Sequence, residues 1–196
     1  MNKICLAAVL ALVLSGCGVG RMAPQAALFD LGPESPAAVQ LPPRTAIVLV
    51  YSASAALGDT GVIWRVGDST TPKAYAGFRW TEPPSSLVRQ RLQDRLSRQG
   101  AVLSDSAGTG APQLRVTLTR FEQVFAPDGA SSQGEVALQA VLLQDGKLLG
   151  QRRFARQAAA PTQDAAGGVA ALRQATDAAA DELAAWLASV LPPRAG

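Results

Sequence analysis

A long alanine-rich segment near the end of the sequence, residues 165–190, constrains the fold most, because its larger side chains recur alternately three and four positions apart. This spacing places them on one face of an α-helix. The members of this face are Val169, Leu172, Thr176, Ala179, Leu183, Trp186 and Val190. Alanine and threonine in its middle favour close packing on a β-sheet over a coiled-coil seam, which is the alternative. We therefore predict a helix over Ala165–Val190, ended by Pro192 and Pro193, that covers a sheet.

A second helix is predicted after Trp80, with Thr81 as its N-cap, prolines in its first turn and Gly100 as a left-handed C-cap. Its apolar stripe consists of Leu87, Val88, Leu92 and Leu96. Its opposite face, which we expect to be in contact with water, carries Arg89, Arg91, Asp94, Arg95 and Arg98. This helix also needs a sheet on which to bury its stripe.

Short apolar runs between turn residues supply the strands of that sheet. The predicted strands are Leu28–Leu31, Ala46–Tyr51, Val62–Val66, Lys73–Trp80, Leu114–Leu118, Val136–Leu143 and Leu148–Phe154, and residues 101–103 return towards the sheet. Val136–Leu143 is apolar on both faces except at Gln139, so it should lie centrally, and Asp145-Gly146 predicts a tight hairpin after it. The sequence thus predicts an α+β fold in two layers: a mixed, mostly antiparallel sheet of about six or seven strands, with two amphipathic helices packed on one face.

The amino-terminal segment has the features of an export signal. Lys3 precedes an apolar stretch, Ile4–Leu14, and the small pair Ser15-Gly16 precedes Cys17. The stretch is shorter than the roughly 20 residues that cross a bilayer, so we expect residues 1–16 to be removed. The segment resembles the lipobox of bacterial lipoproteins, which implies cleavage before Cys17 and acylation of that residue. Two or three acyl chains would anchor the protein permanently; the alternative is an ordinary signal peptide with a chance cysteine.

The remaining chain divides into three parts. Residues 17–27 read as a lipidated flexible tether, residues 28–191 as a single domain and residues 192–196 as a disordered tail. Gly18 and Val19 follow the cysteine without an aspartate. By the sorting rule of many bacterial lipoproteins, this implies the outer membrane, on its periplasmic face.

The composition argues against catalysis and against nucleic-acid binding. The formal charge is +3, and loss of Lys3 with the signal leaves 3 − 1 = +2, without any basic run interleaved with aromatics. The sequence has no histidine, Cys5 leaves with the signal and Cys17 carries lipid, so serine–histidine, cysteine–histidine and zinc chemistries are excluded. A carboxylate pair is the remaining option, yet most of the 15 acidic residues should be solvated surface charges. We expect no enzyme, metal or cofactor.

Aromatic side chains are the candidates for partner contacts, because aromatics often anchor interfaces. The candidates are Tyr75, Phe78, Trp80, Phe121 and Phe125. Burial in the core is the commoner fate of a strand aromatic, and Trp80 in particular is suited to packing beneath the first helix.

Four segments, in this order, resemble the ABC-type transport auxiliary lipoproteins. They are Phe29–Pro33, Tyr75–Pro84, Arg120–Phe125 and Ala185–Leu187. The first carries Phe29 where the family usually has tyrosine. In that family the lipoprotein accompanies an ABC transporter and an MCE-domain protein that move lipids between the inner and outer membranes.

The resemblance implies a lipid-anchored periplasmic docking or adaptor component of an MCE-type lipid transport system. Its expected partners are the MCE-domain protein with its permease and ATPase, the outer-membrane lipid through Cys17, and further copies of itself if it forms a homo-oligomer. Two other functions stay open. One is a structural envelope lipoprotein or outer-membrane assembly factor without a transporter. The other is a domain that itself carries lipid, which would need an apolar cavity of several hundred cubic ångströms.

Overall fold

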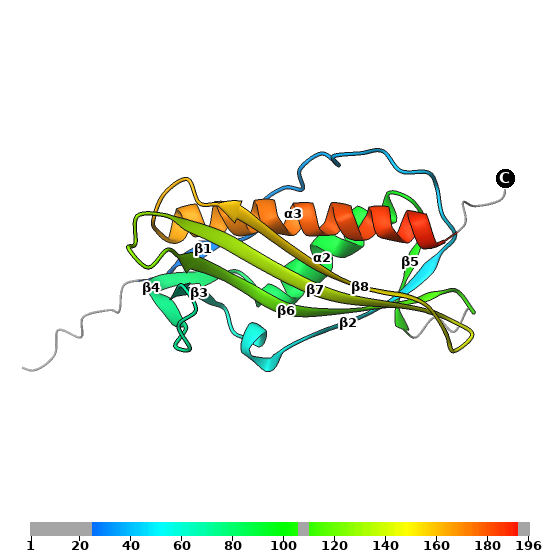
Figure 1. The fold of residues 1–196 in the computed structure, drawn as a ribbon, viewed down its shortest axis with the longest axis horizontal. Helices are drawn as coiled ribbons and strands as arrows, with labels where there is room; N and C mark the ends of the chain where they lie inside the picture. Colours follow the sequence, from blue (N-terminus) through cyan, green and yellow to red (C-terminus); the bar gives the residue numbers. More distant parts are fainter. Residues whose placement is uncertain (1–24, 106–109, 192–196) are drawn as a thin grey trace, which may run out of the picture.

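A computed structural model describes residues 25–105 and 110–191 (Figure 1). Its elements are β1 (Ala27–Phe29), β2 (Ile47–Ala53), the 3₁₀ turn η2 (Ala55–Gly58), β3 (Gly61–Val66), β4 (Lys73–Trp80), α2 (Pro84–Ser97), β5 (Val102–Leu103), β6 (Gln113–Phe125), β7 (Ser132–Gln144), β8 (Lys147–Ala159) and α3 (Ala165–Val190). The eight strands form one mixed sheet, and the two helices pack on one face of it. The α+β prediction is confirmed, with β5 as an additional short strand.

Antiparallel pairing dominates the three long strands, as predicted. β6 pairs with β7, and β7 pairs with β8, over almost their whole lengths. β7, predicted to be central, therefore lies between two strands. The predicted hairpin after it is confirmed, because Asp145 and Gly146 both have positive φ, 50° and 74°.

The short strands add four parallel pairings that the sequence pattern did not reveal. The free edge of β6 is shared: β2 pairs with Gln113–Leu118, and β3 pairs with Gln123–Phe125, both parallel. β4 is antiparallel to β3, β1 is parallel to β4 at the sheet edge, and β5 is parallel to β2. β1, β3 and β4 thus form the end of the sheet opposite to the turn between β7 and β8, whereas β2 and β5 lie towards that turn (Figure 1).

Helix α3 lies along β7 and β8 and buries the predicted stripe (Figure 1). It approaches the sheet closely at Gly134, where an added Cβ would lie 2.5 Å from the backbone nitrogen of Leu172. Asp164 caps the helix by accepting a hydrogen bond of 2.8 Å from the backbone N–H of Gly167. The small side chains of the stripe are what allow this close approach.

The predicted caps of α2 were both wrong. The helix begins at Pro84 after Pro83, with no side-chain cap, and the backbone N–H of Thr81 instead donates to Phe29. Gly100 does not adopt a left-handed conformation. Glycine is required at position 100 because an added Cβ would lie 2.5 Å from the carbonyl oxygen of Arg44.

The predicted signal (1–16), most of the tether (17–27) and the tail (192–196) lie outside the described residues. β1 begins at Ala27, within the predicted tether by one residue. The lipidation prediction for Cys17 therefore stays a prediction.

Candidate functional site

Five aromatic rings form a continuous row across the end of the sheet that contains β1. Phe29 of β1 stacks on Phe78 of β4 at 5.7 Å between ring centroids, and Phe78 meets Tyr75 edge-on at 6.2 Å. Trp64 of β3 lies 5.9 Å from Tyr75 and 5.6 Å from Phe125 of β6. Every one of these side chains is half-buried. We call these five residues the aromatic row.

Three of the five predicted contact residues, Tyr75, Phe78 and Phe125, belong to this row. The other two do not: Trp80 and Phe121 are 2% and 3% exposed and pack edge-on in the core at 5.4 Å. Both rings belong to the buried hydrophobic core, so the interpretation of strand aromatics as core applies to this pair. The sequence analysis did not name Trp64 as a contact residue, and it named Phe29 only as part of the resemblance to the family.

The row stays open because α3 begins too late to cover it. Gly167 and Gly168 let the first turn of the helix approach closely, and an added Cβ at Gly168 would lie 2.0 Å from Gln123. The amide oxygen of Gln123 accepts a hydrogen bond of 2.8 Å from the hydroxyl of Tyr75. Burial raises the pKa of this hydroxyl to about 12, with a further contribution from the charge of Asp164. The aromatic row thus continues the layer of side chains under α3 beyond the start of the helix, where these side chains stay partly exposed to solvent.

A hollow of about 340 Å³ opens beside the row. Its walls include Trp64, Tyr75, Phe125, Val66, Pro127 and Gln163. Val66 is 40% exposed. The ammonium group of Lys73 lies 5.2 Å from the centre of the Trp64 ring, a cation–π distance. Such a hollow, with aromatic walls and little charge, suits an apolar anchor from a partner protein.

A second feature corrects the expectation for α2. Arg91 and Arg95, predicted to face water, are 5% and 1% exposed. Arg91 forms an ion pair with Asp177 of α3, and Arg95 pairs with Asp181 at 2.6 Å. The sequence carried a signal for this, because the two arginines and the two aspartates are each spaced by four residues and can face each other across two helices that run in the same direction.

These guanidinium groups also hold the segment Leu31–Leu41, which we call the strap, across α2 and α3. Arg91 donates to the carbonyl oxygens of Leu31 and Gly32 at 2.9 and 2.7 Å. Arg95 donates to the carbonyl of Ser35 at 2.9 Å and pairs with Glu34 at 2.6 Å. Beyond the strap, the Arg44 guanidinium donates to the carbonyl oxygen of Leu96 in the last turn of α2 at 2.8 Å, and desolvation lowers its pKa to about 10. The strap is therefore fixed at both ends.

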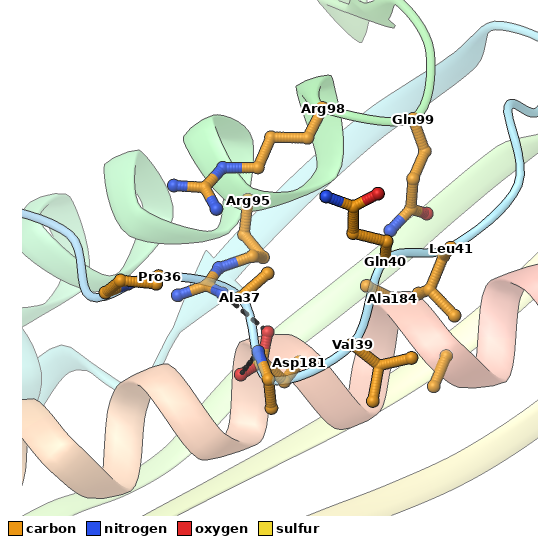
Figure 2. Close-up of a pocket in the computed structure, with 12 residues that line it drawn as sticks. Pro36, Ala37, Val39, Gln40, Leu41, Arg95, Arg98, Gln99, Asp181 and Ala184 are labelled. Atoms are coloured by element: carbon orange, nitrogen blue, oxygen red, sulfur yellow. Dashed lines mark hydrogen bonds and ion pairs between the residues drawn. The ribbon is translucent and has the colours of Figure 1, made fainter.

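Between these ends, a cleft of about 460 Å³ lies under the strap (Figure 2). Its residues are Pro36, Ala37, Ala38, Val39, Gln40 and Leu41 of the strap, Arg95, Arg98 and Gln99 at the end of α2, and Asp181, Ala184 and Ala185 of α3. Figure 2 shows the Gln99 amide pointing from the end of α2 towards Gln40 and Leu41. Close packing between the strap and the helices is thus interrupted at this cleft.

Two further observations concern residues 25–105 and 110–191. Neither helix in this part is long and apolar enough to cross a membrane. No three histidine, cysteine or acidic side chains of the same part come together as metal ligands would.

Comparison with known proteins gives one family and a fold. The model of a family described as ABC-type transport auxiliary lipoprotein component matches residues 29–184. A crystal structure of a protein from Xanthomonas campestris, assigned to the family model DUF330, has a TM-score of 0.67 at 22% identity, covering 86% of this chain and 95% of that one. A crystal structure of an uncharacterized protein has a TM-score of 0.65 at 20% identity, covering 83% and 99%. No curated protein matches the chain.

Proposed function

Because the chain belongs to the family of ABC-type transport auxiliary lipoprotein components, we propose that it is the docking component of an MCE-type lipid transport system. In this role it stands on the periplasmic face of the outer membrane, anchored through acylated Cys17. It holds the periplasmic end of the MCE-domain protein, which the permease and ATPase serve from the inner membrane. It is not an enzyme in this proposal, and the absence of histidine from the whole sequence supports that part.

The aromatic row is the observation that carries the docking role. Aromatic side chains in a half-exposed hollow are typical of the centre of a protein interface, where a few anchors supply most of the binding energy. The row also lies at the end of the sheet where the chain enters β1 from the predicted tether (Figure 1). We propose that Tyr75, Phe78 and Phe125, together with Trp64 and Phe29, contact the MCE-domain protein.

Val66→Glu provides a direct test of this surface. The side chain is 40% exposed and lines the hollow, so the new carboxylate costs the free protein little and would be desolvated in the complex. Leu148→Glu is the matched control, because Leu148 is also an exposed apolar strand residue, 61% exposed, beside the hairpin at the opposite end of the sheet.

The assay is recovery of the MCE-domain protein with the affinity-tagged lipoprotein from detergent-solubilised membranes. We expect Val66→Glu to abolish recovery and Leu148→Glu to retain it, at equal expression and equal thermal stability. We also expect deletion of the gene to sensitise the outer membrane to detergent, and Val66→Glu to fail to restore resistance. Recovery of the partner by Val66→Glu would refute the proposed surface, and recovery by no variant, wild type included, would refute the partnership.

A further inference from the structure

The middle of the strap is held much more weakly than its ends. Arg91, Arg95 and Arg173 fix its first part through hydrogen bonds of 2.7–2.9 Å to backbone carbonyls. From Pro36 to Gln40, the described part of the chain shows one hydrogen bond, from the backbone N–H of Ala38 to Asp181 at 3.4 Å. Val39 is 67% exposed although it is a large apolar residue. Opening the cleft therefore requires little beyond loss of that one long contact.

The strap and α3 line the cleft mostly with small or apolar side chains, and its polar lining residues are Gln40, Arg95, Arg98, Gln99 and Asp181. Alanines from the strap and from α3 face each other across it, with Val39 and Leu41 beside them (Figure 2). The two arginines at its edge are already neutralised: Arg95 by Asp181 and Glu34, and Arg98 by Glu34 at 2.5 Å. A phosphate or carboxylate would therefore find no free cation there, whereas a hydrocarbon chain would contact the alanine, valine and leucine side chains of the strap and α3.

One polar group in the cleft lacks a partner. Gln99 is 9% exposed, and its amide oxygen is buried without a hydrogen bond. A buried polar atom in this state costs about 1–3 kcal/mol unless a ligand or a water satisfies it. Its amide points at Gln40 of the strap (Figure 2). Two neutral amides beside the small and apolar side chains of the strap and α3 suit the uncharged, hydrogen-bonding end of an amphiphile.

We propose that this cleft binds a single acyl chain, with its neutral polar end at Gln99 and Gln40. The volume of about 460 Å³ falls in the range of ligand-binding pockets. The proposal rests on the proposed function, since it places a lipid on the transport component itself. The chain belongs either to a free membrane lipid or to the acylated Cys17 of the same molecule, and the experiment separates these sources.

The probe is a monopalmitoylglycerol with a diazirine in its acyl chain, added below its critical micelle concentration to the purified full-length protein. After irradiation, mass spectrometry locates the labelled peptides and gives the apparent affinity. We expect labels on the strap and on the last turns of α3. The same measurement on mature protein carrying Cys17→Ser, exported through a general secretory signal, shows whether the protein's own acyl chains compete with the probe.

Ala185→Phe fills the cleft from its exposed rim, and Ala170→Phe places the same change at an exposed site of α3 outside it. We expect the first to weaken labelling at least tenfold and the second to change it less than twofold. Gln99→Leu keeps the size of the side chain and removes the amide, and should weaken binding about two- to tenfold, the equivalent of one hydrogen bond.

Labelling of both the acylated and the Cys17→Ser proteins supports a free lipid as occupant, and labelling of the Cys17→Ser protein alone supports the protein's own acyl chain. Labelling of neither, or equal labelling of the Ala185→Phe and Ala170→Phe variants, overturns the proposal. These results are independent of the docking assay, because they use purified protein without the MCE partner. A failed docking assay with a labelled cleft would thus remove the proposed function alone.

Discussion

Replacing the buried Arg91 of α2 by methionine should strongly destabilise this protein. The guanidinium forms an ion pair with Asp177, whose side chain is 9% exposed, and donates to the carbonyl oxygens of Leu31 and Gly32. After the substitution the nearest cation to Asp177 is Arg95, at 3.9 Å. A buried carboxylate left without its partner costs about 3–5 kcal/mol. This is a large part of the 5–15 kcal/mol that typically separates folded from unfolded domains.

The double variant with Asp177→Leu separates the charge from the packing. Apolar replacement of a buried pair is often neutral, so we expect most of the lost stability to return, to within about 1–2 kcal/mol of the wild type. The strap carbonyls still lack their donor in the double variant, which is why recovery should be incomplete. Arg89→Met, an exposed arginine on the same helix, is the control and should change stability by less than about 0.5 kcal/mol.

Urea unfolding followed by tryptophan fluorescence measures these differences. With a slope of about 1–3 kcal/mol per molar urea, Arg91→Met should lower the unfolding midpoint by roughly 2 M. A midpoint shift equal to that of Arg89→Met would show that Arg91 is solvated. A double variant as unstable as Arg91→Met would show that the loss comes from packing or from the strap rather than from an orphaned carboxylate.

Three further predictions concern the core, the tyrosines and the α3 cap. Gly134→Ala should destabilise the protein by about 1–3 kcal/mol, because the new Cβ would collide with the backbone of α3. Gly58→Ala is the control and should be near neutral in the same urea titration, because no atom lies within 4 Å of a Cβ added there. Ultraviolet titration should show no tyrosinate near pH 10, because burial raises the pKa of both tyrosines, that of Tyr75 to about 12. The stability that the buried tyrosines contribute should be complete below pH 10 and should fall as the pH rises towards 12. Titration of Tyr51 near its ordinary pKa in the folded protein would contradict its packing. Asp164→Ala should lower the melting temperature at neutral pH, because the side chain caps α3. The difference in melting temperature between the variant and the wild type should shrink as the pH falls through the lowered pKa of the Asp164 carboxyl, since the protonated side chain is a weaker acceptor. An equal difference at all pH values would argue against the cap.

Part of the candidate site was readable from the sequence and part was not. Tyr75, Phe78 and Phe125 were named as contacts because aromatics mark interfaces, but the same reasoning named Trp80 and Phe121, which are core. All five lie on strands with similar local patterns. Their fates differ because α2 and α3 cover some strand positions and not others, and the sequence around each ring carries no information about where a distant helix begins.

The sequence by itself determined the elements of this protein: the bounds of α3, the β7–β8 hairpin, the buried stripes and the absence of histidine chemistry. These follow from periodicity, turn stereochemistry and composition, which act over a few residues. Only the tertiary structure decided that β6 shares one edge between β2 and β3, that Arg91 and Arg95 lie in the interior, and that a strap crosses the helices over a cleft. Arginine prefers water unless a carboxylate from elsewhere in the chain meets it. Each of these arginine–carboxylate pairs joins residues 86 positions apart. The burial of the two arginines therefore depends on how the helices pack and not on the sequence of either helix alone.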